Sequence, residues 1–126
     1  MTEVHYIIAS NPNTPAKVLV KLASAADHSI RRQVAANPQT PEIILEDLSR
    51  DEDWDVRLSV ALNPSVPLRL LESLAQDEQA SVRFGVAENI DTPDSILETL
   101  LEDDCPYVSH RAAITMAGKI VKARVS

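Results

Sequence analysis

The sequence is poor in cysteine, glycine and aromatic residues, and each shortage excludes a kind of structure. Cys105 is the one cysteine, which excludes an intramolecular disulfide and a cysteine-only metal cluster. A single thiol suits a reducing compartment, so we expect a cytoplasmic location. With two glycines and 3% aromatics, the turns must use other residues and the core must consist of Leu, Ile, Val and Ala. No apolar run approaches the ~20 residues of a membrane span, and the N-terminus carries no signal-peptide pattern.

Acidic residues outnumber basic ones, for a formal net charge of −7. Such a chain is repelled by nucleic acid and by anionic membranes unless one face is locally basic. The hydrophobic content of 44% is sufficient for a folded core. The length of 126 residues suits one domain, so we predict a single domain over residues 1–126.

A short turn motif recurs at a fixed interval. NPNTP stands at residues 11–15, NPQTP at 37–41, NPSVP at 63–67 and a diverged copy, NIDTP, at 89–93, each 26 residues after the last. Apolar columns repeat with the same period. The clearest columns are Val4, Ile30, Val56, Val82 and Val108; Ala9, Ala35, Ala61, Ala87 and Ala113; Leu19, Leu45, Leu71 and Leu97; and Leu22, Leu48, Leu74 and Leu100. This periodicity predicts stacked copies of one unit, a solenoid.

Each repeat is predicted to contain two short helices, named helix A and helix B. Helix A is predicted to begin at the second proline of the motif, as at Pro15. Proline suits this position because an N–H in the first turn would have no partner within the helix. The preceding hydroxyl, as in Thr14, is placed to cap the free N–H groups, and Val18, Leu19 and Leu22 follow at helical spacing. The same threonine recurs as Thr40 and Thr92.

Helix B is predicted to begin after Asp27, Asp53, Gln79 and Cys105. Aspartate is a good N-cap, and Pro106 sits where a first-turn proline belongs. The Asn-Pro pair ends helix B, because the residue before proline leaves the helical region, and the asparagine side chain can bond to the local backbone. No stretch alternates as a strand would, so the fold class is all-α.

The pattern A-x-N-P-x-T-P-x-x-x-L-x-x-L-x-x-D…V-R-x-x-V-A resembles the leucine-rich repeat variant family over residues 4–114. The D-x-x-V-R portion is also similar to HEAT repeats. The resemblance implies a right-handed superhelix of about four to five two-helix repeats without a sheet, in which one helix is often 3₁₀. The family period is usually a little shorter, which leaves open whether helix B is α or 3₁₀ here. Some members carry an N-terminal iron–sulfur cysteine cluster, which this chain lacks.

The two ends differ from the repeats between them. Residues 1–10 correspond to a lone helix B and are predicted to cap the array, which runs over residues 11–104. Residues 105–126 are predicted to form one long closing helix, because Thr115, Met116 and Lys119 replace the asparagine and prolines of the corner.

Arg31, Arg57 and Arg83 fall on the same arc of helix B as its apolar columns. A buried charge is nearly always paired, so we expect an Arg–Asp ladder between repeats rather than an anion site. The candidate acidic partners are Asp27, Asp51, Asp53 and Asp77. The DEDWD run at 51–55 lacks the glycine and downstream glutamate of a calcium loop, and no metal site is expected.

The opposite, variable face of helix B carries most of the aromatic residues. Trp54, Leu58 and Leu62 form a stripe on one helix, and Phe84 lies on the next helix. An apolar patch on an outward face is typical of a partner-binding surface. Half-burial by curvature of the superhelix is the structural alternative. The predicted partner-binding residues, with the charged groups at the rim, are Trp54, Leu58, Leu62, Phe84, Arg32 and His28.

Catalysis has no support in the sequence, which lacks a glycine-rich phosphate loop, a nucleophile elbow and metal-ligand spacing. We therefore expect a non-enzymatic scaffold without a cofactor that binds a protein or peptide, with no membrane contact. The alternatives are a homodimer through the same patch, nucleic-acid binding through a local basic strip, and an accessory protein that handles a cofactor or chromophore. The strip would comprise Arg32, His110, Arg111 and the basic C-terminus.

Overall fold

A computed structural model describes residues 2–125, and all regular structure in this part of the chain is α-helical. None of its helices is long and apolar enough to cross a lipid bilayer. Helix B is α-helical throughout, which settles the choice between α and 3₁₀. The helices are α1 (Thr2–Ser10), α2 (Ala16–Leu22), α3 (His28–Ala36), α4 (Glu42–Leu48), α5 (Trp54–Leu62), α6 (Leu68–Leu74), α7 (Ala80–Glu88), α8 (Asp94–Leu101) and α9 (Pro106–Val125).

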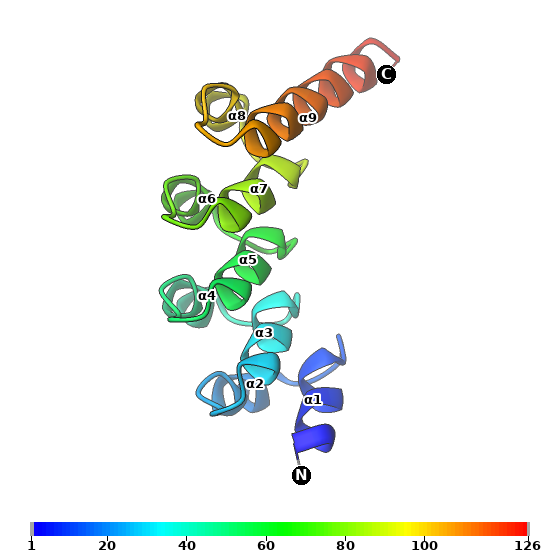
Figure 1. Ribbon diagram of the computed structural model, residues 1–126. Coiled ribbons are helices and arrows are strands. Elements are labelled where there is room, and N and C mark those ends of the chain that lie inside the picture. The colour runs from blue at the N-terminus through cyan, green and yellow to red at the C-terminus, as the bar shows by residue number, and fades with distance from the viewer. Residues whose placement is uncertain (1, 126) are drawn as a thin grey trace.

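The helices form two rows along an extended stack, with the N- and C-termini at opposite ends (Figure 1). The odd-numbered helices are the predicted B helices, and each packs on the next odd-numbered helix. The even-numbered A helices lie along one side of that row (Figure 1). This arrangement confirms a stack of helix pairs without a sheet in the described residues.

The core lies between the two rows and consists of the repeating columns. Leu19, Leu45, Leu71 and Leu97 are all 0–1% exposed. The exceptions are at the ends, where Val4 is half exposed and Ala113 is exposed, because the terminal helices have a neighbour on one side only. Burying a leucine side chain stabilises the folded state by about 1.5–3 kcal/mol, so each repeat depends on its neighbours for stability.

The asparagines at the ends of α3, α5 and α7 bond both locally and to the previous repeat. Asn37 Oδ1 accepts the N–H of Gln39 at 2.9 Å, which is the predicted local bond. Its Nδ2 also donates to the carbonyls of Ala9 at 2.8 Å and Asn11 at 2.9 Å, one repeat earlier. These cross-repeat bonds satisfy carbonyls that a helix C-terminus leaves free. The same type of bond runs from Asn63, Asn89 and Thr115 to Ala35, Ala61 and Ala87.

The predicted role of the threonines is wrong. Thr14 Oγ1 donates to the carbonyl of Ile8 at 2.6 Å, at the end of α1, and does not cap α2. Thr40 and Thr92 do the same within their repeats. The carbonyl of Ile8 also accepts the N–H of Asn11 at 3.2 Å, so the hydroxyl of Thr14 adds a second hydrogen bond to a carbonyl at the end of helix B. Pro15 is the N-cap residue and α2 begins at Ala16, one residue later than predicted.

The predicted starts of helix B are confirmed, but the caps differ. Asp27 accepts the backbone N–H of Ser29 and caps α3 as expected. Asp53 precedes α5 but makes no capping bond, because its carboxylate is bound to Arg31 at 2.5 Å.

The last helix, α9, runs for 20 residues through the place where another corner would stand. Its first half packs on α7 as a helix B, and it also contacts α8. Lys119 takes the place of a corner proline and donates to the carbonyl of Thr92, with Asp94 Oδ1 at 3.4 Å. The final residue, 126, lies outside the described part of the chain.

Candidate functional site

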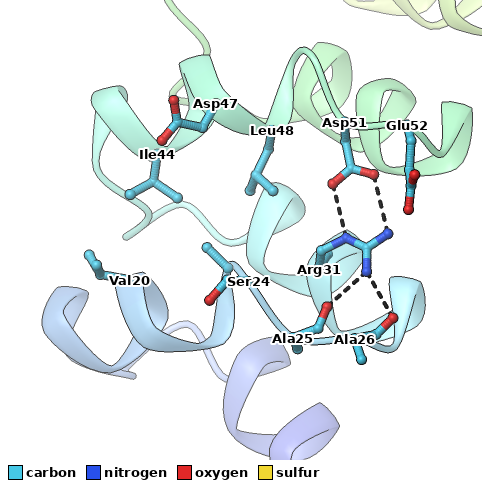
Figure 2. A pocket seen from close by; sticks show the side chains of 11 residues that line it. Val20, Ser24, Ala25, Ala26, Arg31, Ile44, Asp47, Leu48, Asp51 and Glu52 are labelled. Atoms are coloured by element: carbon cyan, nitrogen blue, oxygen red, sulfur yellow. Dashed lines mark hydrogen bonds and ion pairs between the residues drawn. The ribbon is translucent and has the colours of Figure 1, made fainter.

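The buried arginines were the first candidate site, and Figure 2 shows Arg31 bonded to the Asp51 carboxylate and to the carbonyls of Ala25 and Ala26. Its Nε and Nη2 bond to the Asp51 carboxylate at 2.9 and 3.3 Å, and Nη2 also reaches Asp53. Nη1 donates to the carbonyls of Ala25 and Ala26 at 2.8 and 3.0 Å. A guanidinium has five N–H donors, and all five are used. Arg31 therefore has no donor left to bind an anion in the pocket that it lines.

The same arrangement recurs in the next two repeats, which confirms the predicted ladder. Arg57 Nε lies 2.8 Å from Asp77 Oδ2, and Arg83 Nε lies 2.8 Å from Asp103 Oδ2. Asp103 was missing from the expected partners, although each partner lies 20 residues after its arginine. Asp27, which was among them, is used as a helix cap instead.

The ladder shifts the pKa values of its members. The bond from Asp51 raises the pKa of Arg31 above its ordinary value, against the effect of burial. Burial raises the pKa of Asp103, but the bonds from Arg83 and from the Cys105 N–H outweigh burial and hold it below its ordinary value. Arg31 and Asp103 belong to different pairs of the ladder. Each therefore stays ionised at neutral pH, as a structural ion pair requires.

The second candidate is an apolar hollow of about 460 Å³ on the B-helix row. Three of the predicted residues, Trp54, Leu58 and Phe84, line it. The hollow spans three helices, α5, α7 and α9. The remaining lining residues, which the sequence did not single out as site residues, are Ala80, Ser81, Cys105, Tyr107 and Val108.

The hollow exists because two small side chains stand between two large ones. Ala80 on α7 occupies the repeat position that Trp54 fills on α5, and Ser81 occupies the position that Tyr107 fills on α9. Trp54 is 44% exposed and Tyr107 is 79% exposed, so both large rings rise above the surface. A change from a large to a small residue in one column, as from Trp54 to Ala80, was the signal that could have found this site.

Leu58 packs partly into the protein because the residue beneath it, Gly85, has no side chain. A Cβ atom on Gly85 would lie 2.3 Å from Leu58 Cδ1, so this leucine occupies the space of the missing side chain. Leu58 and Phe84 are accordingly half-buried. The structural alternative of half-burial thus applies to these two residues, whereas Trp54 remains exposed.

The other predicted residues lie near the hollow without lining it. Leu62 is 42% exposed at the end of α5. His28 and Arg32 of α3 both turn toward Asp55 of α5, with His28 Nδ1 at 2.8 Å and Arg32 Nη1 at 3.9 Å from Asp55 Oδ2. The charge of Arg32 is partly neutralised there. The partner-binding role of the six residues stays a prediction.

Groups that could support other chemistry are sparse over residues 2–125. This part of the chain holds no cluster of three or more His, Cys, Asp or Glu side chains that could bind a metal ion. Cys105 is a free, half-buried thiol at the edge of the hollow. Of the expected basic strip, Arg32 is near Asp55, and Arg111 has its Nε buried without a hydrogen bond.

The comparison with known protein families gives one match. The family model described as leucine rich repeat variant matches residues 54–79. These residues cover one full period, from the first residue of α5 to the residue before α7, and the match confirms the resemblance for that repeat. No curated protein and no solved structure matches the chain.

Proposed function

We propose that this chain is a non-enzymatic binding module that holds a protein or peptide on its B-helix row. The proposal includes a right-handed superhelix of about four to five repeats, a cytoplasmic location and no resident cofactor. The observation that carries it is the apolar hollow over Ala80, between Trp54 and Tyr107. Concave apolar sites flanked by exposed aromatic side chains are where binding energy concentrates in protein interfaces.

The framework supports this role because it holds the hollow in a fixed shape. The three helices that line it are tied to one another by the side-chain bonds of Asn89 and Thr115 and by the Arg–Asp pairs. A preorganised surface loses little conformational entropy when a partner binds, so more of the contact energy appears as affinity.

The test fills the hollow with a larger side chain and removes none of the large side chains that line it. Ala80→Trp places on α7 the side chain that α5 already carries at the same repeat position, so the fold should tolerate it. Ser73→Trp, on the exposed face of α6, is the matched control. Both variants and the wild type are used to capture proteins from a native lysate, with and without nuclease, and circular dichroism checks their helix content.

The expected result is a protein retained by the wild type and by Ser73→Trp but lost with Ala80→Trp. Equal capture by all three would show that the hollow is not the binding site and would refute the proposal. Capture that disappears with nuclease would favour nucleic acid instead. Light scattering gives the mass of each purified protein. A dimer mass for the wild type and Ser73→Trp, with a monomer mass for Ala80→Trp, would identify the partner as a second copy of the chain.

A further inference from the structure

One polar group beside the hollow lacks a partner. The Nε atom of Arg111 is buried and makes no hydrogen bond, and among residues 2–125 it is the one buried side-chain nitrogen or oxygen in that condition. Buried donors in native proteins are nearly always bonded, so an exception calls for an explanation. The arginines of the ladder show the contrast, since Arg31 uses every donor it has.

The repeat geometry places Arg111 next to the hollow, although Arg111 is not one of its lining residues. Arg111 occupies on α9 the position that Gly85 occupies on α7. At Gly85, the side-chain direction points at Leu58 and Ala61 of the preceding B helix. Because α9 packs on α7 in the same way, Arg111 emerges against the residues one repeat later, which include Phe84. Phe84 lines the hollow, and so does Tyr107, one turn before Arg111 on α9.

No acidic side chain of the described residues forms an ion pair with Arg111. Asp55 is engaged by His28 and Arg32, and Asp103 is engaged by Arg83. Glu88 is exposed at the end of α7, and no ion pair within 4.0 Å joins it to Arg111 among the described residues. The guanidinium therefore carries a positive charge without an ionic partner, and because its Nε is buried, a bound segment can reach only its terminal Nη1 and Nη2 groups.

We infer that the segment bound at the hollow carries a bulky apolar side chain followed closely by a carboxylate. The apolar group enters the space over Ala80, and the carboxylate accepts hydrogen bonds from Arg111. A guanidinium matches a carboxylate in shape and charge, and such charge-assisted bonds are the strong ones. The net charge of −7 slows the approach of an acidic segment, but it is screened beyond roughly 8 Å at physiological salt. This inference rests on the proposed function.

The test uses a phage-displayed library of random peptides, selected on the wild-type chain and depleted on Ala80→Trp. The surviving peptides are synthesised twice, once with their Asp or Glu and once with Asn or Gln in its place. Fluorescence anisotropy then gives the affinity of each pair for the wild type and for Arg111→Gln. Changing the peptide instead of the protein separates the loss of a contact from any damage to the fold.

The expected result is that acid-to-amide replacement weakens binding to the wild type by roughly 10- to 100-fold, as for a hydrogen bond between charged groups. The same replacement should change binding to Arg111→Gln by less than about twofold, because the carboxylate no longer has a guanidinium to bind. Hollow-dependent peptides that lack an acid preference, or that favour Lys and Arg, would overturn this inference and leave the proposed function standing. A library without any hollow-dependent peptide would overturn both.

Discussion

Replacing Asn63 by alanine tests whether the asparagines hold neighbouring repeats together. Asn63 is 1% exposed, and its Nδ2 donates to the carbonyls of Ala35 at 2.7 Å and Asn37 at 2.9 Å. Its Oδ1 also accepts the N–H of Ser65 at 2.7 Å. The substitution removes all three bonds and leaves the buried carbonyl of Ala35 without its side-chain partner.

The expected cost follows from these contacts. A typical hydrogen bond contributes about 1 kcal/mol net, and a buried group left unbonded costs about 1–3 kcal/mol. We count the bonds to Asn37 and Ser65 at about 1 kcal/mol each and the unbonded carbonyl of Ala35 at about 1–3 kcal/mol. Together they predict a loss of about 3–5 kcal/mol in the free energy of unfolding. That is a large fraction of the roughly 5–15 kcal/mol that stabilises a whole domain.

Urea unfolding followed by circular dichroism gives the loss directly, and Asn11→Ala is the matched control. Asn11 makes the same local bond, to the N–H of Asn13 at 2.9 Å, but it is exposed and has no earlier repeat to bond in the described chain. We expect the control to lose only about 0.5–1.5 kcal/mol. Equal losses for the two variants would refute the idea that the cross-repeat bonds stabilise the stack. A change in the urea dependence would instead indicate that repeats unfold separately.

Two further predictions concern the ladder and the hollow. Because its pKa is lowered in the folded state, Asp103 stabilises the fold above its unfolded pKa of about 3.9, and this contribution is lost as the pH falls through the folded pKa. Urea midpoints should therefore separate the wild type from Asp103→Asn at pH ~7 and converge near pH ~2, and a gap unchanged by pH would contradict the Arg83–Asp103 pairing. Gly85→Ala should destabilise the protein by about 1 kcal/mol, because the clash with Leu58 exceeds the gain in helix propensity of about 1 kcal/mol. In a Leu58→Ala background the same change should become stabilising, and a loss of stability in both backgrounds would show that Leu58 is not the obstacle.

Periodicity explains why so much of the fold was predictable. A column of apolar residues every 26 positions is buried because each copy meets the same neighbours, so Leu71 and Val56 could be placed in the core without coordinates. The Asn-Pro corner is a local backbone effect, and local effects depend on adjacent residues alone. The arginine ladder followed from charge balance, since a buried guanidinium must find a carboxylate.

The sequence by itself determined the helices, their corners, the core columns and the need for a partner for each buried arginine. The tertiary structure decided what depends on the distance and angle between repeats. The hydroxyl of Thr14 can serve either of two helix ends, and the turn of the chain selects the earlier one. The amide of Asn37 reaches the previous repeat only at the spacing that the stack adopts. Ala80 is an ordinary small residue in the sequence, and it becomes the floor of a hollow because stacking brings Trp54 and Tyr107 to either side of it.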